Sequence, residues 1–323
     1  MKITNVEAIL TAPEGIRLVV VKVTTDLAGL YGLGCATFSQ RALTVATEIE
    51  QYLKPFLIGR DATEISDIHS AMYLSSYWRG GAVLNNAIAG VDQALWDIKA
   101  KAANVPAYQL FGGKVRDELA TYVHVNGDNE IEIAANITEL AKTGFKNFRV
   151  QVALSNNAGY GVGKATQTAL GKQPTQSYRL QDPDYRWDEA AYLQAVPKLF
   201  KYLRENLPTE YNFIHDVHER VSPNAAIQLA KQLEPYNLFY LEDPVAPDDT
   251  GYLAQLRTQS AIPIAMGELF THQSEYLPLI QNRQLDYIRC HISQIGGITP
   301  AIKLTHFAEV YGVKTAWHGP GDV

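Results

Sequence analysis

A short apolar run followed by a stretch with helical spacing recurs along the second half of the chain. Three of these runs, NFIHD, LFYLED and IPIAMGE, carry an acidic residue at their end. An apolar run of four to eight residues before a helical pattern is typical of a buried parallel strand in a βα unit. Further strands of this kind are expected at residues 121–125, 145–152, 286–290 and 313–317. Seven such strands predict an α/β protein built on a (β/α)8 barrel of the TIM type.

The first part of the chain has a different pattern. The alternation in RLVVVKVTT is typical of a half-buried antiparallel strand, and strands are expected at residues 3–10, 17–24 and 30–36. Helical spacing follows at residues 43–53, 65–77 and 87–103. With Gly112-Gly113 and the charged KVRDE as a boundary signal, we expect an α+β domain at residues 1–115 and a barrel domain at residues 116–323.

A closed barrel of this type has eight strands, one more than the pattern supplies. A barrel with a missing strand would expose two long parallel edges, which natural proteins avoid. We therefore expect the native polypeptide to continue beyond Val323 with an eighth strand. Residues 153–185, rich in Gly, Asn, Gln and Thr, follow the second barrel strand. A loop of this length is usually a lid, a binding loop or a disordered region, and we expect a lid.

Asp216, Glu242 and Glu268 follow one another at a constant interval of 26 residues. Repeated βα units place them at the carboxyl ends of neighbouring strands, where barrel enzymes build their active sites. A single acid at a strand end is more often a helix cap or a solvated loop residue, but capping does not explain equal spacing. Three convergent oxygen ligands suit a hard divalent cation. The pattern predicts one Mg²⁺ in each active site, bound by these three residues.

Other polar residues are expected at the same end of the barrel. His218 lies two residues beyond Asp216, whereas His215 is expected to face the helices if alternation holds. The remaining candidates are His124, Arg149, Arg289, His318 and Asp322. Each alone could be an ordinary loop or core-edge residue, but their convergence on the end that carries the acids predicts a site.

Composition limits the classes of function. A content of 46% hydrophobic and 19% charged residues is that of a soluble globular protein. The net charge of −6 gives no reason to expect nucleic acid or a membrane surface as a partner. The two cysteines lack the spacing of a disulfide framework or a zinc site. Without a signal peptide or a long apolar run, a cytoplasmic location is expected.

Several motifs occur in an order that resembles a known family. They are YWRGGAV, ALWDIKAK, HVNG, FRVQ, AGYGVG, HDVHE, LEDP, GELF, DYIR and HGPGD. Together they resemble the enolase superfamily, within its mandelate racemase and muconate lactonizing enzyme group. Inside that group the chain is most similar to the D-mannonate dehydratase family, in its low-activity, galactonate dehydratase-like (starvation-sensing) branch. The resemblance spans the whole chain and implies that the α+β domain caps the barrel.

The resemblance implies a chemistry. Water would be eliminated from a six-carbon sugar acid, D-mannonate or D-gluconate, to give 2-keto-3-deoxy-D-gluconate. Mg²⁺ would stabilise the charge that accumulates on the substrate carboxylate when the α-proton leaves. Tyr160 would act as the base beside Arg149, whose charge lowers the tyrosine pKa. His218 would protonate the departing 3-hydroxyl.

The resemblance also implies substrate contacts. The residues that would bind substrate are Ser39, Gln40, His124, Glu242, Glu268, Arg289, His318 and Asp322. Two departures from the family pattern bear on activity. Arg149 and Gln151 replace the Lys-x-Lys pair of the wider group, which disfavours a lysine-based racemase or cycloisomerase. Pro320 stands where efficient mannonate dehydratases carry Ala, and because proline fixes φ and lacks an N–H donor, low efficiency is expected.

Two alternatives stay open. The protein could dehydrate another acid sugar, such as galactonate, or it could be a catalytically retired barrel that binds a metabolite and acts in regulation. The presence of Arg149, Tyr160 and His218 argues against the second alternative, because a pure binding protein needs neither a base nor an acid. Barrels of this group commonly form symmetric homo-oligomers, so such an assembly is expected.

Overall fold

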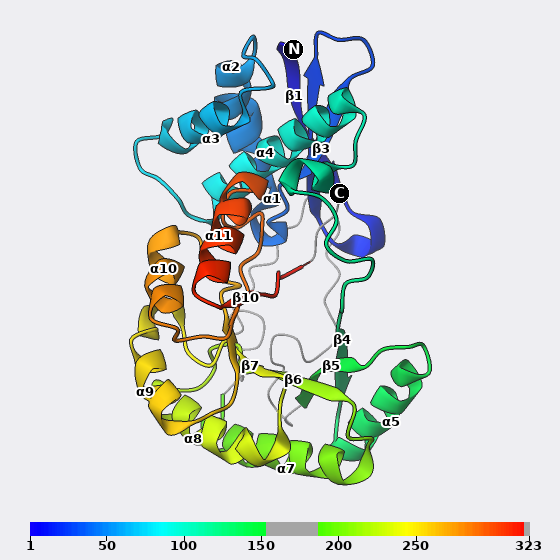
Figure 1. The fold of residues 1–323 in the computed structure, drawn as a ribbon, viewed down its shortest axis with the longest axis vertical. Helices are drawn as coiled ribbons and strands as arrows, with labels where there is room; N and C mark the ends of the chain where they lie inside the picture. The colour runs from blue at the N-terminus through cyan, green and yellow to red at the C-terminus, as the bar shows by residue number, and fades with distance from the viewer. Residues whose placement is uncertain (153–186, 320–323) are drawn as a thin grey trace.

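The computed structural model describes residues 1–152 and 187–319 (Figure 1). The expected lid at residues 153–185, together with Tyr160, Pro320 and Asp322, lies outside the described residues. Within the described ranges, no helix has both the length and the apolar character that crossing a membrane requires.

The chain begins with a three-stranded antiparallel sheet. It consists of β1 (Ile3–Thr11), β2 (Leu18–Thr25) and β3 (Tyr31–Cys35), paired in sequence order. Along β2 every second side chain is buried, including Val19, Val21 and Val23, as the alternating pattern predicts. The sheet therefore has one face toward a core and one toward solvent.

Helices cover the buried face of this sheet. They are α1 (Ala42–Thr47), a π-helix at Glu48–Leu53, α2 (Lys54–Leu57), α3 (Ile65–Leu74) and α4 (Ala82–Ala103). Helix α4 approaches β3 so closely that a Cβ on Gly34 would lie 2.0 Å from the Gly90 carbonyl oxygen. Glycine at this position is what allows the helix to pack on the strand.

The second part of the chain forms a seven-stranded parallel sheet. Its strands are β4 (Val123–Gly127), β5 (Asn147–Val152), β6 (Asn212–Asp216), β7 (Tyr240–Glu242), β8 (Ile264–Met266), β9 (Tyr287–Ile288) and β10 (Lys314–Thr315). They pair in sequence order, with β4 and β10 at the two edges. The described residues thus supply the seven predicted strands of a TIM-type barrel.

Helices lie along the outside of these strands, as Figure 1 shows for α5 and α7 to α10. The barrel helices are α5 (Glu130–Ala141), α7 (Glu189–Asn206), α8 (Pro223–Leu233), α9 (Tyr252–Gln259), α10 (Gln273–Gln281) and α11 (Ile298–Val310). This arrangement confirms the predicted fold class, a TIM-type barrel with an N-terminal α+β unit.

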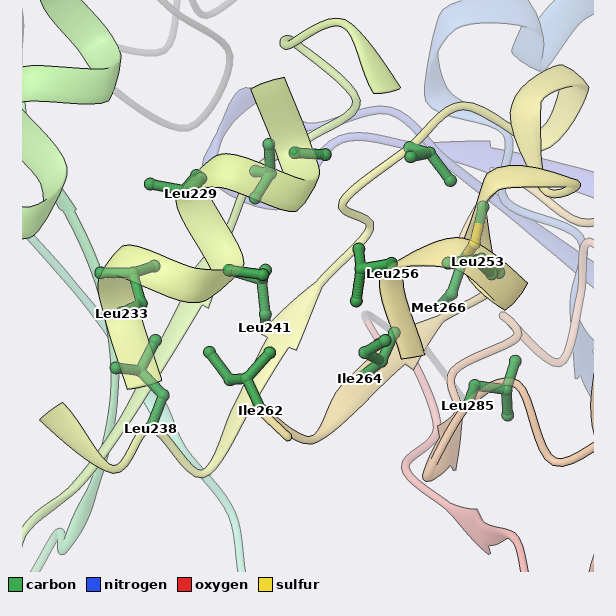
Figure 2. Close-up of a cluster of buried hydrophobic side chains, with 14 of the residues drawn as sticks. Leu229, Leu233, Leu238, Leu241, Leu253, Leu256, Ile262, Ile264, Met266 and Leu285 are labelled. Carbon is green, nitrogen blue, oxygen red and sulfur yellow. The ribbon is translucent and has the colours of Figure 1, made fainter. Parts of the chain in front are cut away.

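Apolar side chains lie on both faces of the barrel sheet. Leu241, Ile264 and Met266 pack with α8 and α9 in the cluster shown in Figure 2. Ile214 and Tyr240 belong to a separate cluster. Strands buried on both faces are typical of parallel sheets, which explains why they appeared in the sequence as continuous apolar runs.

The α+β unit and the barrel each have their own hydrophobic cluster. The cluster of the α+β unit consists of residues between 3 and 98, and that of the barrel consists of residues between 125 and 313. The division of the chain after residue 115 stays a prediction.

Candidate metal centre and active site

The three predicted metal ligands lie at the carboxyl ends of adjacent strands. Asp216 is the last residue of β6 and is paired with Glu242, the last residue of β7. Glu268 comes two residues after the end of β8. Asp216 and Glu242 are buried. The parallel register therefore brings these side chains to one place, as the regular spacing predicts.

The guanidinium group of Arg149, on β5, lies among these acids. It forms ion pairs with Asp216 and, through Nε, with Glu242 Oε2 at 3.3 Å. Its Nη2 lies 3.3 Å from His218 Nδ1, and its Nη1 lies 3.5 Å from the ring nitrogens of His124. Arg149 thus links β5 to β4, β6 and β7, and it contacts two predicted site histidines.

His218 and His318 contact different carboxylate oxygens of Glu268. His218 Nδ1 contacts Asp216, and its Nε2 lies 3.4 Å from Glu268 Oε1. His318 Nε2 lies 2.9 Å from Glu268 Oε2. The structure therefore brings both predicted histidines to the same carboxylate.

Burial and charge set the ionisation of these groups. Burial lowers the pKa of His218 to about 4, with Glu268 opposing and Arg149 reinforcing the shift. Burial also lowers the pKa of His124 to about 4, aided by the charge of Arg149. Burial alone would raise the pKa of Glu268, but the hydrogen bond to His318 and the neighbouring positive charges hold it at about 2. The carboxylate at position 268 is therefore charged at neutral pH, as a metal ligand must be.

Arg289 follows β9 and holds Glu242 from the other side. Its Nε donates to Glu242 Oε1 at 2.5 Å, and its Nη2 donates to the hydroxyl of Tyr122 at 2.7 Å. Its Nη1 donates to the Ala316 carbonyl oxygen at 3.3 Å. Glu242 thus lies between two guanidinium groups. The expected role of Arg289 toward substrate stays a prediction.

Ser39 and Gln40 begin the short 3₁₀ helix Ser39–Arg41 that follows β3, and Ser39 Oγ donates to Gln40 Oε1 at 3.1 Å. Just before them, the Cys35 carbonyl oxygen accepts from Ser293 Oγ at 3.2 Å. The end of β3 therefore contacts the loop after β9. The approach of Ser39 and Gln40 to substrate stays a prediction.

His215 shows how alternation assigns a side chain to a face. Its Nε2 lies 2.7 Å from the Tyr192 hydroxyl, and its Nδ1 lies 3.0 Å from the Val150 carbonyl oxygen. Its ring also packs against Phe200 of α7. His215 therefore faces the helices, as predicted, and has no place among the acids.

The described residues fit a divalent cation. Two groups have ligand atoms within 4.8 Å of one another: Asp216 with His218 and Glu268, and Asp216 with Glu242 and Asp243. Asp216 is common to both groups, so each predicted acid belongs to at least one. Buried carboxylate oxygens are the donors that Mg²⁺ prefers. The donor chemistry therefore matches the predicted cofactor.

Asp243 is the member of these groups that the sequence analysis did not select. Its φ of +39° lies in the left-handed region, which a regular strand does not adopt. The sequence analysis assigned side chains to faces by regular strand alternation, and Asp243 does not follow it. The pair of acids in LEDP was the available signal. Burial raises the pKa of Asp243 well above its usual range, and the charges of Glu268 and Glu242 add to the shift.

Comparison with known proteins agrees with this fold and site. Residues 4–112 match the mandelate racemase / muconate lactonizing enzyme N-terminal domain, and residues 132–323 match the enolase C-terminal domain-like family. The chain belongs to the enolase superfamily, in its mandelate racemase and muconate lactonizing enzyme group, as the ordered motifs predicted.

Relatives in this superfamily are similar over the whole chain. A D-galactonate dehydratase family member of Musicola paradisiaca is 54% identical over 100% of this chain and 78% of that protein. One from Salmonella enteritidis is 53% identical with the same coverage.

Solved structures extend the likeness to three dimensions. An enolase from Pantoea ananatis with bound D-gluconate and Mg superposes with a TM-score of 0.91 at 50% identity, over 99% of this chain and 78% of that one. An enolase from Agrobacterium radiobacter with bound Na and L-malate superposes at 0.83 and 28% identity, over 99% and 74%. The predicted cofactor is therefore the metal found in a relative of the same fold.

Proposed function

We propose that the protein is a Mg²⁺-dependent hydro-lyase that dehydrates six-carbon sugar acids to 2-keto-3-deoxy acids. The observation that supports this most is the contact of Arg149 with Asp216, Glu242 and His218 at one end of the barrel. Carboxylates for a metal, a guanidinium and an imidazole in mutual contact are the groups that proton abstraction beside a carboxylate requires.

Asp216, Glu242 and Glu268 would hold the metal. When bound, Mg²⁺ would supply positive charge that offsets the negative charge growing on the substrate carboxylate. Arg289 donates to Glu242 and fixes that carboxylate, which limits its freedom to turn away from a cation. Arg289 thus fixes the orientation of the Glu242 carboxylate.

Tyr160 is the proposed base, with Arg149 beside it. A guanidinium within a few ångströms favours a phenolate and lowers the pKa of a tyrosine. His218 is the proposed acid for the departing 3-hydroxyl. The contact of His218 with Arg149 and with two proposed metal ligands supports this role.

D-gluconate is the first substrate to test, since a relative at 50% identity was solved with it. Galactonate is the second candidate substrate, because the relatives are named D-galactonate dehydratase family members. D-mannonate follows from the motifs, with low efficiency expected because Pro320 lies two residues after His318. Binding through His124, His318 and Asp322, with Ser39 and Gln40 from the α+β unit, is part of the proposal. So are a cytoplasmic location and a symmetric homo-oligomer.

The test uses the protein with Mg²⁺ and a panel of six-carbon aldonic acids in D₂O. It follows the 2-keto-3-deoxy product and exchange at the α-carbon. Product formation that Tyr160→Phe or Glu242→Gln abolishes is the expected result. Exchange without product would indicate a working base and another substrate. If every acid gave neither signal, the dehydratase proposal would be wrong and the retired, metabolite-binding barrel would replace it.

A further inference from the structure

We propose that Asp243 is a fourth carboxylate of the metal centre, a residue for which the preceding mechanism has no role. The proposal rests on the Mg²⁺ site of the proposed function but not on dehydration itself. Asp243 follows Glu242 directly, and its side chain is only 2% exposed.

The backbone places Asp243 on the side of the acids. In a regular strand, successive side chains point to opposite faces, so residue 243 would point away from residue 242. A φ of +39° interrupts that alternation. One oxygen of Asp243 consequently lies within 4.8 Å of ligand oxygens of Asp216 and Glu242. A left-handed conformation is unfavourable at a non-glycine residue, so the surrounding structure must hold it.

Backbone hydrogen bonds hold Asp243 to its neighbours. Its N–H donates to the Ala265 carbonyl oxygen of β8 at 2.9 Å, and its carbonyl oxygen accepts from the Glu219 N–H beyond β6 at 3.0 Å. These bonds join the loop that follows Asp216, the end of β7 next to Glu242, and strand β8, which precedes Glu268. Asp243 is therefore fixed relative to all three ligand positions.

The two carboxylate oxygens of Asp243 have different surroundings. Oδ1 accepts from the Gly267 N–H at 3.0 Å, directly before Glu268. Oδ2 is buried and lacks a hydrogen-bond partner among the described residues. A buried polar atom without a partner destabilises the fold, and more so when it is charged. A cation would satisfy Oδ2, either directly or through a metal-bound water.

Charge counting favours the same conclusion. Asp216 and Glu242 lie in one group with Asp243, and Glu268 lies in a second group that shares Asp216. Arg149 and Arg289 provide the two guanidinium groups in contact with these acids. When all four carboxylates are ionised around a bound cation, they and the two guanidinium groups leave two negative charges, which one divalent cation balances. A bound cation also reverses the repulsion that like charges exert on one another.

The deciding experiment compares Mn²⁺ and Mg²⁺ binding by the unmodified chain and by Asp243→Asn. Asparagine keeps an oxygen for the Gly267 N–H but removes the charge. We expect Mn²⁺ affinity, measured by calorimetry and by electron paramagnetic resonance, to fall tenfold or more. The melting temperature without metal should not fall, because asparagine keeps the hydrogen bond from the Gly267 N–H. A residue with a purely structural role would instead lower that temperature and leave the affinity unchanged.

Asp248→Asn is the matched control, because this exposed carboxylate lies five residues further along the same chain segment. It should bind Mn²⁺ as the unmodified chain does. If Asp243→Asn does not fold, Asp243→Ser tests the same loss of charge with a smaller side chain. Unchanged affinity in a folded Asp243 variant would overturn the proposal, as would an unmodified chain that binds no Mn²⁺. Metal binding without dehydration would contradict only the proposed function.

Discussion

At the scale of single residues, Arg149 is the counter-charge of the buried acids. Its side chain is 4% exposed, and it pairs with Asp216 and Glu242, whose side chains are fully buried. Removing one partner of a buried ion pair leaves an uncompensated charge, at a cost of about 3–5 kcal/mol. Arg149→Met should therefore lower the free energy of unfolding by about 3 kcal/mol, measured by urea denaturation with a chelator present.

Arg149→Lys serves as the control for that measurement. It keeps a positive charge but loses the planar fork that contacts two carboxylates at once, so it should recover only part of the stability. An Arg149→Met variant as stable as the unmodified chain would show that the ion pairs contribute nothing to the fold.

The site residues also show which contacts a sequence can predict. Asp216, Glu242 and Glu268 were predicted because each closes a short apolar run at a constant interval, so chain spacing determines their position. Asp243 was missed because, although LEDP contains two adjacent acids, the side to which Asp243 points depends on a backbone angle that the motif does not specify. The contacts of Arg289 with Tyr122 and Ala316 join residues far apart in the sequence, and such pairings depend on barrel geometry.

At the scale of secondary-structure elements, helices α4 and α11 join the α+β unit to the barrel. Asp92 of α4 accepts from the Thr299 N–H at 2.9 Å and from its hydroxyl at 2.5 Å. Trp96 Nε1 donates to the same hydroxyl oxygen at 3.0 Å. The carboxylate therefore caps the first turn of α11, where the helix dipole favours a negative charge.

This contact should make stability depend on pH. Burial raises the pKa of Asp92 to about 7, with the Thr299 hydrogen bonds opposing the shift. Between about pH 4 and 7 the folded state then keeps a proton that the unfolded state has lost, so the contribution of Asp92 to stability falls as pH rises and is constant above that window. The stability advantage of the unmodified chain over Asp92→Asn should shrink by up to roughly 3 kcal/mol from pH 4 to 7.

Urea denaturation of both proteins at several pH values measures this difference. The comparison is needed because the pKa of His124 and of His215 is lowered to about 4, which makes stability rise with pH in an overlapping window. Those histidines are present in both proteins and cancel in the difference. A constant difference from pH 4 to 7 would mean that Asp92 is ionised throughout.

Element boundaries were predicted less well than the elements themselves. The first barrel strand was expected at residues 121–125 and lies at Val123–Gly127, because Asn129 caps α5 through its side chain and the strand extends almost to that cap. The helix expected at residues 43–53 is an α-helix that continues as a π-helix. Hydrophobic spacing specifies which face is buried, but not the hydrogen-bond pattern of each turn.

At the scale of the whole molecule, metal binding should couple the barrel strands into a more stable unit. The proposed ligands come from three strands, and β4 and β10 are sheet edges among the described residues. A ligand that binds only the folded state stabilises it by about 2.7 kcal/mol at a concentration one hundred times its dissociation constant. Saturating Mg²⁺ should therefore raise the melting temperature by several degrees.

Scanning calorimetry with increasing Mg²⁺, followed by excess chelator, checks this expectation. The rise should follow the Mg²⁺ concentration logarithmically and be reversed by the chelator. Glu268→Gln should lose most of the rise, because it removes the charge of one predicted ligand while keeping its size. The control is the same measurement with sodium at equal ionic strength. It separates binding at the site from screening of the net charge of −6, which any salt would produce. A rise of equal size with sodium would mean that the acids do not form a selective divalent site.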